Sequence, residues 1–438
     1  MAVKKLIALA LSVLLTLCLA GCDGLAFNVD ELLVAPKLEG DMHPVQQALE
    51  ESTTENITLR YPALGDYRSA IVMKDINNNG TKEAFAFYST TTADGAVTMH
   101  INIIEKNDDE WKSKGDISLM GSGIESVSFA DLDGKGRLEI IVGWYIFGTT
   151  EKQVGVYTYE GGLLTQRAIE PYTQFAYADL TGDGVDDLAV IYLNLTEKTS
   201  TAKLLSLGDK GIIEVGIVKL DPSVSAYSTP VFSKLSDNTP ALYIDAAKGS
   251  GTITEIIWCK DGVLNGIYNP ETPELSLTFR NSTVASGDYN NNGIIDIPLP
   301  ELLLSTAEMA ESDKVFYSNW SEFSGTEFKT VSSAFMVYAD GYSITVPENI
   351  KQNFLVIRKA EARTRLFYSY NPDKGEAGDE IFRTVVVTTL EYHKETFENS
   401  GYTELGKTDN LVYLAKITED NSYGFTAETV KSMFALIE

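Results

Sequence analysis

The sequence predicts a mainly β protein, with a β-propeller of about five four-stranded blades followed by a small α+β domain. Four short stretches with one shared pattern begin at Asp75, Asp131, Asp179 and Asp288. Short apolar runs rich in Val, Ile, Tyr and Phe flank these stretches, and such runs are typical of strands. About four of them fit each interval, which is the size of a propeller blade. We therefore expect the propeller over residues 57–333 and the α+β domain over residues 334–438.

The N-terminus has the layout of a secretory signal. Two lysines precede an apolar run, residues 6–19, that is too short to span a bilayer comfortably. The sequence then reads Leu-Ala-Gly-Cys, which resembles the processing site of bacterial lipoproteins. This resemblance implies that residues 1–21 are removed and that a lipidated Cys22 anchors the protein to the bacterial membrane, outside the cytoplasm. The alternative is an ordinary signal peptide cut near the same place, with Cys22 left as a free thiol.

The composition excludes one class of partner. The net charge is −27, and removal of the two signal lysines moves it to −29. So acidic a surface repels the phosphates of nucleic acid, and we expect no nucleic-acid partner. After processing, Cys259 is the only cysteine besides the anchor, which leaves no pair for an intramolecular disulfide. Cys259 ends an apolar run, so we expect it to be buried as a small hydrophobic residue.

Residues 22–56 are expected to form a lipid-anchored tether with one short helix. Pro44 fits the first helical position, and Val45, Ala48 and Leu49 form a narrow apolar stripe. A strand at residues 57–60 could then close the ring against the last unit, which would remove an exposed sheet edge.

Each repeated unit can be divided into strands around its Asp-rich stretch. The stretches begin 56, 48 and 109 residues apart, so the last interval is two periods long. A hidden unit is therefore expected there, around residues 234–238, which have lost the Asp pattern. The predicted strands are 70–73, 84–88 and 97–104 in the first unit; 127–130, 140–144, 154–159 and 163–169 in the second; 175–178, 188–192, 203–207 and 212–220 in the third; 230–233, 241–244 and 253–259 in the hidden unit; and 284–286, 297–299 and 315–319 in the last, where Pro298 interrupts the second strand.

The rhythm changes after Val331. Residues 426–437 read as a helix with Thr426 at the N-cap and Glu428 in the first turn. Its apolar face contains Val430, Met433, Phe434 and Ile437. Longer strands with a terminal helix predict a separate α+β domain. Its predicted strands are 334–338, 342–346, 354–358, 365–370, 382–390 and 411–417.

The four stretches have the chemistry of cation-binding loops. Each has Asp at position one, small polar residues at alternate positions, Gly at position six and an acid at position nine. The alternation turns oxygens toward one centre, and the glycine permits a sharp turn. A hard cation such as Ca²⁺ takes six to eight oxygens of this kind. The candidate ligands are Asp75, Asn77, Asn79 and Glu83 in loop 1; Asp131, Asp133 and Glu139 in loop 2; Asp179, Thr181, Asp183 and Asp187 in loop 3; and Asp288, Asn290, Asn292 and Asp296 in loop 4.

The four loops are not equal. Loop 3 has three carboxylates and a hydroxyl and is the strongest candidate, whereas loops 1 and 4 have two carboxylates each and predict weaker binding. Loop 2 has Lys135 at position five, where an ammonium opposes a cation and could neutralise the acids internally. The alternative for all four is that Asn, Asp and Gly form good turns, with the acids capping backbone donors and no metal bound.

These loops resemble those of FG-GAP and VCBS repeats, as in integrin-type propellers and many secreted bacterial proteins. The resemblance covers about residues 57–331. It implies a propeller and an adhesion or interaction role, with an extracellular protein or glycan as partner. The EF-hand differs, because its closing Glu is at position twelve between two helices.

Catalytic motifs are weak. His43, His100 and His393 share no short metal-ligand spacing, and His100 is expected on a strand surface. The four tryptophans fall in or beside predicted strands, which suits packing between neighbouring units; a carbohydrate-binding platform is the alternative. We therefore expect a lipid-anchored surface binding protein with Ca²⁺-stabilised loops. The alternative is an extracytoplasmic hydrolase that uses the central channel of the propeller.

Overall fold

The computed structural model describes residues 42–91, 95, 97–108, 110–119, 121–359 and 363–437. The signal, residues 1–21, and Cys22 lie outside the described residues. The described part of the chain has no helix that is both long enough and apolar enough to cross a bilayer. Its helices are α3 (Met42–Glu51), α4 (Lys394–Asn399) and α5 (Ala427–Met433).

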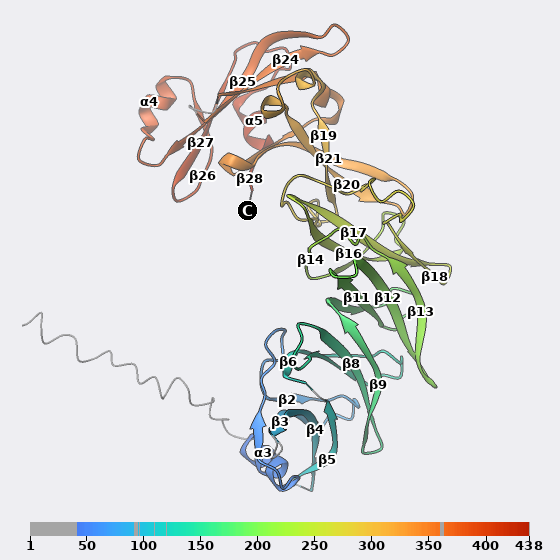
Figure 1. Ribbon diagram of the computed structural model, residues 1–438. Helices are drawn as coiled ribbons and strands as arrows, with labels where there is room; N and C mark the ends of the chain where they lie inside the picture. The colour runs from blue at the N-terminus through green and yellow to red at the C-terminus, as the bar shows by residue number, and fades with distance from the viewer. Residues whose placement is uncertain are drawn as a thin grey trace, which may run out of the picture.

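The fold is mainly β, as predicted, and consists of six antiparallel sheets that follow one another along the chain (Figure 1). Sheet 1 contains β1 (Ile57–Leu59), β2 (Ile71–Lys74), β3 (Glu83–Thr91), β4 (Val97–Asn107) and β5 (Glu110–Leu119); sheet 2 contains β6 (Gly123–Ala130), β7 (Glu139–Tyr145), β8 (Lys152–Glu160) and β9 (Leu163–Tyr172); sheet 3 contains β10 (Gln174–Ala178), β11 (Asp187–Asn194), β12 (Thr199–Gly208) and β13 (Gly211–Lys219). Sheet 4 contains β14 (Ala226–Tyr227), β15 (Val231–Lys234), β16 (Pro240–Lys248), β17 (Gly251–Lys260) and β18 (Val263–Gly266); sheet 5 contains β19 (Ile297–Leu302), β20 (Phe316–Phe323), β21 (Phe328–Val337), β22 (Tyr342–Val346) and β28 (Phe434–Leu436); sheet 6 contains β23 (Phe354–Lys359), β24 (Thr364–Asn371), β25 (Glu376–Thr388), β26 (Thr403–Lys407) and β27 (Leu411–Ile417).

Sheets 1 to 4 each contain the expected meander of consecutive strands. The hidden unit is real, because β15, β16 and β17 form sheet 4 around a turn without the Asp pattern. Cys259 in β17 is buried and forms no disulfide within the described residues.

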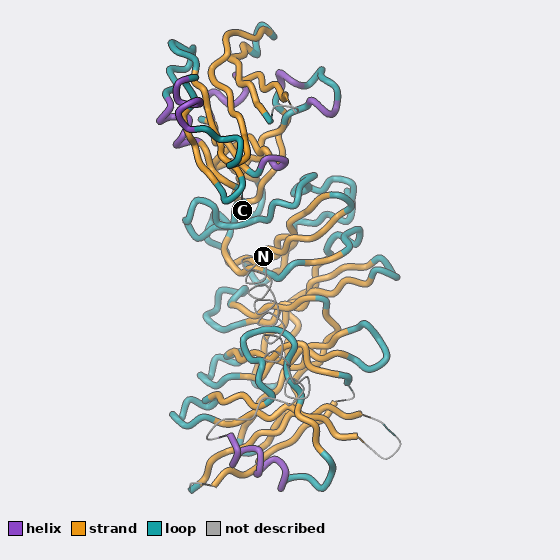
Figure 2. The backbone as a smooth tube through the Cα atoms, turned by 90° about the vertical axis from the view of Figure 1, so that its left-hand side faces the viewer, coloured by secondary structure: helices purple, strands orange, loops and turns teal. Residues whose placement is uncertain are grey.

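The sheets stack face to face through residues that alternate along each strand (Figures 1 and 2). Phe87 and Ile101 of sheet 1 share one apolar cluster with Val142 and Trp144 of sheet 2. Further clusters join sheet 2 to sheet 3, sheet 3 to sheet 4, sheet 4 to sheet 5 and sheet 5 to sheet 6. The core is therefore a series of interfaces between neighbouring sheets.

The series is open, which differs from the expected closed ring. Sheets 1 and 6 lie at opposite ends of the stack (Figure 1), and no apolar cluster of the described residues joins sheet 1 to sheet 5. The expected closing strand, β1, pairs with β3 of its own sheet. The outer face of sheet 1 is covered by α3, whose Val45 and Leu49 pack on Ala84 and Ala86. Sheet 6 packs on sheet 5 at the other end of the stack, so the face that sheet 5 would need for closure is covered.

The segments at both ends also differ in detail from the prediction. The predicted helix of the tether forms, and its buried residues are the predicted Val45, Ala48 and Leu49, but it lies on sheet 1. Position 333 falls inside β21, and sheet 5 continues through β22 to β28. Thr426 caps α5 by accepting a hydrogen bond from the Thr429 amide at 3.2 Å. The helix ends at Met433, and the next residues form β28.

The predicted strand at residues 284–286 does not form. The amide and carbonyl of Asp296 exchange hydrogen bonds with Gly287, at 2.8 and 3.1 Å, so the backbone groups of Asp296 point toward residues 284–287. In a strand every second residue points its backbone groups to the same side, so the next residues that would pair with this segment are Pro298 and Pro300. Proline has no N–H to donate, so pairing stops after Gly287.

Candidate metal-binding loops and cavities

The four Asp-rich loops occupy equivalent corners of sheets 1, 2, 3 and 5. In each unit the residue before the first Asp is paired with the closing acid at position nine. The pairs are Lys74 with Glu83, Ala130 with Glu139, Ala178 with Asp187 and Gly287 with Asp296. The repeat therefore has one geometry, as its spacing predicts.

Two hydrogen bonds recur in all four loops. The first Asp accepts the amide of the position-six glycine at 2.8 to 2.9 Å. The closing acid accepts the amide of position two at 2.8 to 3.1 Å. The acids thus cap backbone donors, which the turn interpretation requires, and each carboxylate keeps further lone pairs for other partners.

The closing acids are buried, with relative exposures between 0 and 3%. Burial penalises the charged form and raises the pKa of Glu83, Asp187 and Asp296 above the ordinary values. The same cause raises the pKa of Glu139 to about 7. A bound cation would reverse this effect, because it stabilises the ionised form.

Loop 2 brings its acids closest together. Among the described residues, only Asp131, Asp133 and Glu139 place three carboxylate oxygens within 4.8 Å of one another. Lys135 neutralises one of these acids, because its ammonium lies 3.1 Å from Asp133. Arg137 also lies 3.1 Å from the same oxygen of Asp133. Burial alone would raise the pKa of Asp133. Its hydrogen bonds to Lys135 and Arg137 together outweigh burial, so the pKa of Asp133 lies below the ordinary value.

Loop 3 uses its acids differently. Asp179 accepts three backbone amides at 2.6 to 3.0 Å. Asp187 accepts the amides of Leu180 and Thr181 and the hydroxyl of Ser206, which reaches it from β12. Its three carboxylates do not form a group as close as that of loop 2.

Loop 4 gains an acid that the sequence pattern did not indicate. Glu322 of β20 is 7% exposed and accepts the side-chain amides of Asn290 and Asn292 at 3.3 and 2.7 Å. It follows the loop by 26 residues, so only its place on the third strand of the unit could have indicated it. Loop 1 is built from its own residues, with the Asn77 amide donating to Glu83 at 2.8 Å.

Three of the loops contain a buried oxygen without a hydrogen-bond partner among the described residues. These are Oδ1 of Asp131, Oγ1 of Thr181 and Oδ1 of Asp296. A buried acceptor that loses its water costs free energy unless something replaces that water. A cation would satisfy all three oxygens, so the donor sets of loops 2, 3 and 4 fit a hard cation.

The other candidates are placed in the core or in polar networks. Trp144 and Trp258 are buried within inter-sheet clusters, as packing between units predicts, whereas Trp320 lines a cavity beside sheet 5. His100 lies between Asp116 at 2.8 Å and Thr90 at 3.1 Å. If Asp116, His100 and Thr90 acted as a catalytic triad, the Thr90 hydroxyl would be the nucleophile and would have to reach the substrate. Thr90 is only 4% exposed. We therefore assign these three residues a structural role across β3, β4 and β5.

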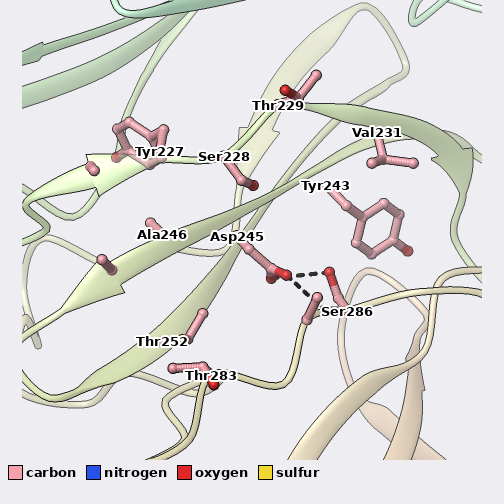
Figure 3. A pocket seen from close by; sticks show the side chains of 13 residues that line it. Tyr227, Ser228, Thr229, Val231, Tyr243, Asp245, Ala246, Thr252, Thr283 and Ser286 are labelled. Atoms are coloured by element: carbon pink, nitrogen blue, oxygen red, sulfur yellow. Dashed lines mark hydrogen bonds between the residues drawn. The ribbon is translucent and has the colours of Figure 1, made fainter. Parts of the chain in front are cut away.

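A cavity of about 420 Å³ lies on sheet 4 beside residues 283–286 (Figure 3). Asp245 of β16 lines it and accepts the amide and the hydroxyl of Ser286 at 2.7 and 3.0 Å. Asp245 also bonds Arg280 at 2.9 Å, and this arginine is 2% exposed. The carboxylate therefore fixes the segment that replaces the missing strand.

No protein family and no curated protein matches the sequence of this chain. Among solved structures, it is similar to rhamnogalacturonan lyase YesW, with a TM-score of 0.32, 11% identity and coverage of 83% of this chain and 92% of that one. A rhamnogalacturonan lyase of Bacillus licheniformis gives a TM-score of 0.31 at 13% identity, over 55% of this chain and 59% of that one. The periplasmic gluconolactonase PpgL of Pseudomonas aeruginosa gives 0.28 at 10% identity, over 73% and 86%. TM-scores this low carry no argument about activity.

Proposed function

We propose that this chain is a lipid-anchored surface protein that binds an extracellular protein or glycan and whose Asp-rich loops hold Ca²⁺. One observation carries the metal part of this proposal: equivalent loops in three units each keep a buried oxygen that has no hydrogen-bond partner in the described part of the chain. The repeated loops resemble those of FG-GAP and VCBS propellers, and this resemblance supports the interaction role. Fold likeness alone does not fix function, so the partner is left open between protein and glycan.

Bound Ca²⁺ would supply charge neutralisation and would tie the first two strands of a unit together. The candidate ligands are Asp131, Asp133 and Glu139; Asp179, Thr181, Asp183 and Asp187; Asp288, Asn290, Asn292, Asp296 and Glu322; and, with fewer carboxylates, Asp75, Asn77, Asn79 and Glu83. Calorimetric melting in millimolar Ca²⁺ and in EGTA tests this. We expect a higher melting temperature with Ca²⁺, and equal temperatures would refute the metal proposal.

The anchor and the partner need separate tests. Replacement of Cys22 by alanine should move the protein from the membrane fraction to the soluble fraction of cells that process lipoproteins. A pull-down from cell-surface extracts, with Ca²⁺ and with EGTA, should then recover a partner. Recovery that depends on Ca²⁺ would assign the interaction to the loops.

A further inference from the structure

A second and larger cavity, here called the groove, lies on the other side of residues 283–285. Its volume is about 740 Å³, and it shares Thr283 and Ala285 with the smaller cavity on sheet 4. One face of sheet 5, loop 4 and the segment from residue 283 line it. The groove thus lies beside the segment that did not form a strand.

The backbone that borders the groove is firmly held. Arg280 is almost fully buried and donates hydrogen bonds to the Val284 carbonyl at 2.6 Å and to Asp245 at 2.9 Å. Ser286 is bound to Asp245 through both its amide and its hydroxyl. Pro298 and Pro300 offer no amide that could draw this segment back into sheet 5. These hydrogen bonds therefore fix the backbone at the border of the groove.

Aromatic rings form the walls of the groove. Tyr289 packs on Trp320 with ring centroids 3.8 Å apart, and Tyr338 also lines the groove. Trp320 is 9% exposed and Tyr289 is 52% exposed, so a buried indole supports an accessible phenol ring. Such a ring offers a flat apolar surface with little conformational entropy to lose on binding.

The lining of the groove combines apolar side chains with hydroxyl groups, and its described residues carry no positive charge. Ser332, Ser343 and Thr345 supply hydroxyls from adjacent strands, and no lysine, arginine or histidine is among the described residues that line the groove. Asp296 also lines it, is 0% exposed, and keeps Oδ1 without a hydrogen-bond partner in the described chain. The groove therefore presents hydrogen-bonding groups beside an aromatic face, and a carboxylate that disfavours anions.

We propose that the groove binds an uncharged saccharide. One face of a pyranose ring is apolar and can stack on Tyr289, while its hydroxyls can bond the serine and threonine hydroxyls that line the groove. Anionic sugars meet no compensating cation there. The inference deepens the proposed function by selecting a glycan as the partner, and it rests on the interaction role but not on Ca²⁺ occupancy.

The full chain, purified in detergent, provides the test. Isothermal titration calorimetry with cellotetraose, xylotetraose, galactotetraose and mannotetraose probes neutral sugars; tetragalacturonate probes anions and tetramethylammonium probes cations. We expect at least one neutral tetrasaccharide to bind and Tyr289→Ala to weaken that binding by about tenfold. Tyr289→Phe keeps the ring and should bind as the unaltered protein does. Tyr177→Ala, which removes a tyrosine with 38% exposure on sheet 3, is the matched control.

The proposal fails if none of the four neutral sugars binds, if Tyr289→Ala binds as tightly as Tyr177→Ala, or if only a charged probe binds. Repeating the titration in EGTA separates the two proposals. If the protein binds sugar but its melting temperature is the same with Ca²⁺ and with EGTA, the groove proposal is supported and the metal proposal is refuted. If the melting temperature depends on Ca²⁺ but no sugar binds, the metal proposal is supported and the groove proposal is refuted.

Discussion

At the residue scale, Lys135 decides what loop 2 can bind. Its ammonium lies 3.1 Å from Asp133 and 2.9 Å from Asp209, so it already supplies the positive charge that a cation would bring. Replacement by asparagine, the residue at this position in loops 1 and 4, removes that charge and adds an oxygen. Loop 2 should then bind Ca²⁺ about tenfold more tightly, because one like charge has left the site.

Calorimetric melting with Ca²⁺ and with EGTA measures this change. The rise in melting temperature caused by Ca²⁺ should be larger for Lys135→Asn than for the unaltered protein. Lys210→Asn, which alters an exposed lysine outside the loops, controls for the change in net charge. An equal rise in both variants would show that Lys135 does not control the site.

A second residue prediction concerns Glu139, whose pKa burial raises from 4.5 to about 7. Because the folded protein prefers the protonated form, this group adds stability that is fully present below pH 4.5 and is lost as the pH rises through about 7. Glu139→Gln mimics the neutral form. In EGTA at pH 7.5 it should be more stable than the unaltered protein by about 1–2 kcal/mol, since solvent at the loop screens part of the effect.

Urea unfolding at a series of pH values checks this sign. The gain from Glu139→Gln should shrink toward zero as the pH falls from 7.5 to about 4.5, because the unaltered side chain then becomes neutral as well. Glu151→Gln alters an exposed glutamate and should give no such pH-dependent gain. A gain independent of pH would mean that ionisation of Glu139 is not its origin.

At the scale of elements, α3 covers the outer face of sheet 1. Val45 and Leu49 of this helix are 0% exposed and pack against Ala84 and Ala86. Leu49→Ala should lower the free energy of unfolding by about 2–4 kcal/mol, through lost burial and a cavity. Gln47→Ala, on the exposed side of the same helix, is the control and should change it by less than about 0.5 kcal/mol. Denaturant unfolding measures both, and similar losses would mean that the helix does not stabilise the sheet.

The same scale shows what the sequence could predict and why. Alternating apolar residues and Asp-rich turns are local signals, so most strands of sheets 1 to 4 and the four corners were predictable, but β5, β14 and β18 were not among the predicted strands. Residues 284–286 do not form a strand because Pro298 and Pro300 occupy the positions that would pair with them. This depends on the register of the strands, which the composition of the segment does not show. Glu322 reaches loop 4 only through strand pairing. Ring closure depends on what covers the end sheets, and no local pattern shows that α3 lies on sheet 1.

At the scale of the whole molecule, the structure is a linear stack in which each sheet packs on its neighbours. Such arrays are stabilised by successive interfaces, much as repeat proteins are, and their ends need covers. Helix α3 and sheet 6 serve as those covers. Extension also separates the acidic groups of a chain whose net charge is −27, which reduces their mutual repulsion.

The open stack predicts an elongated particle in solution. Six sheets that stack about 10 Å apart extend over roughly 60 Å along one axis, which is longer than the stack is wide. Small-angle X-ray scattering of residues 42–438 should therefore give an asymmetric distance distribution with a long tail. The profile should stay the same from low to moderate protein concentration, which excludes association as its cause. A symmetric distance distribution would contradict the open stack and favour a closed ring, because closure would bring sheets 1 and 5 together.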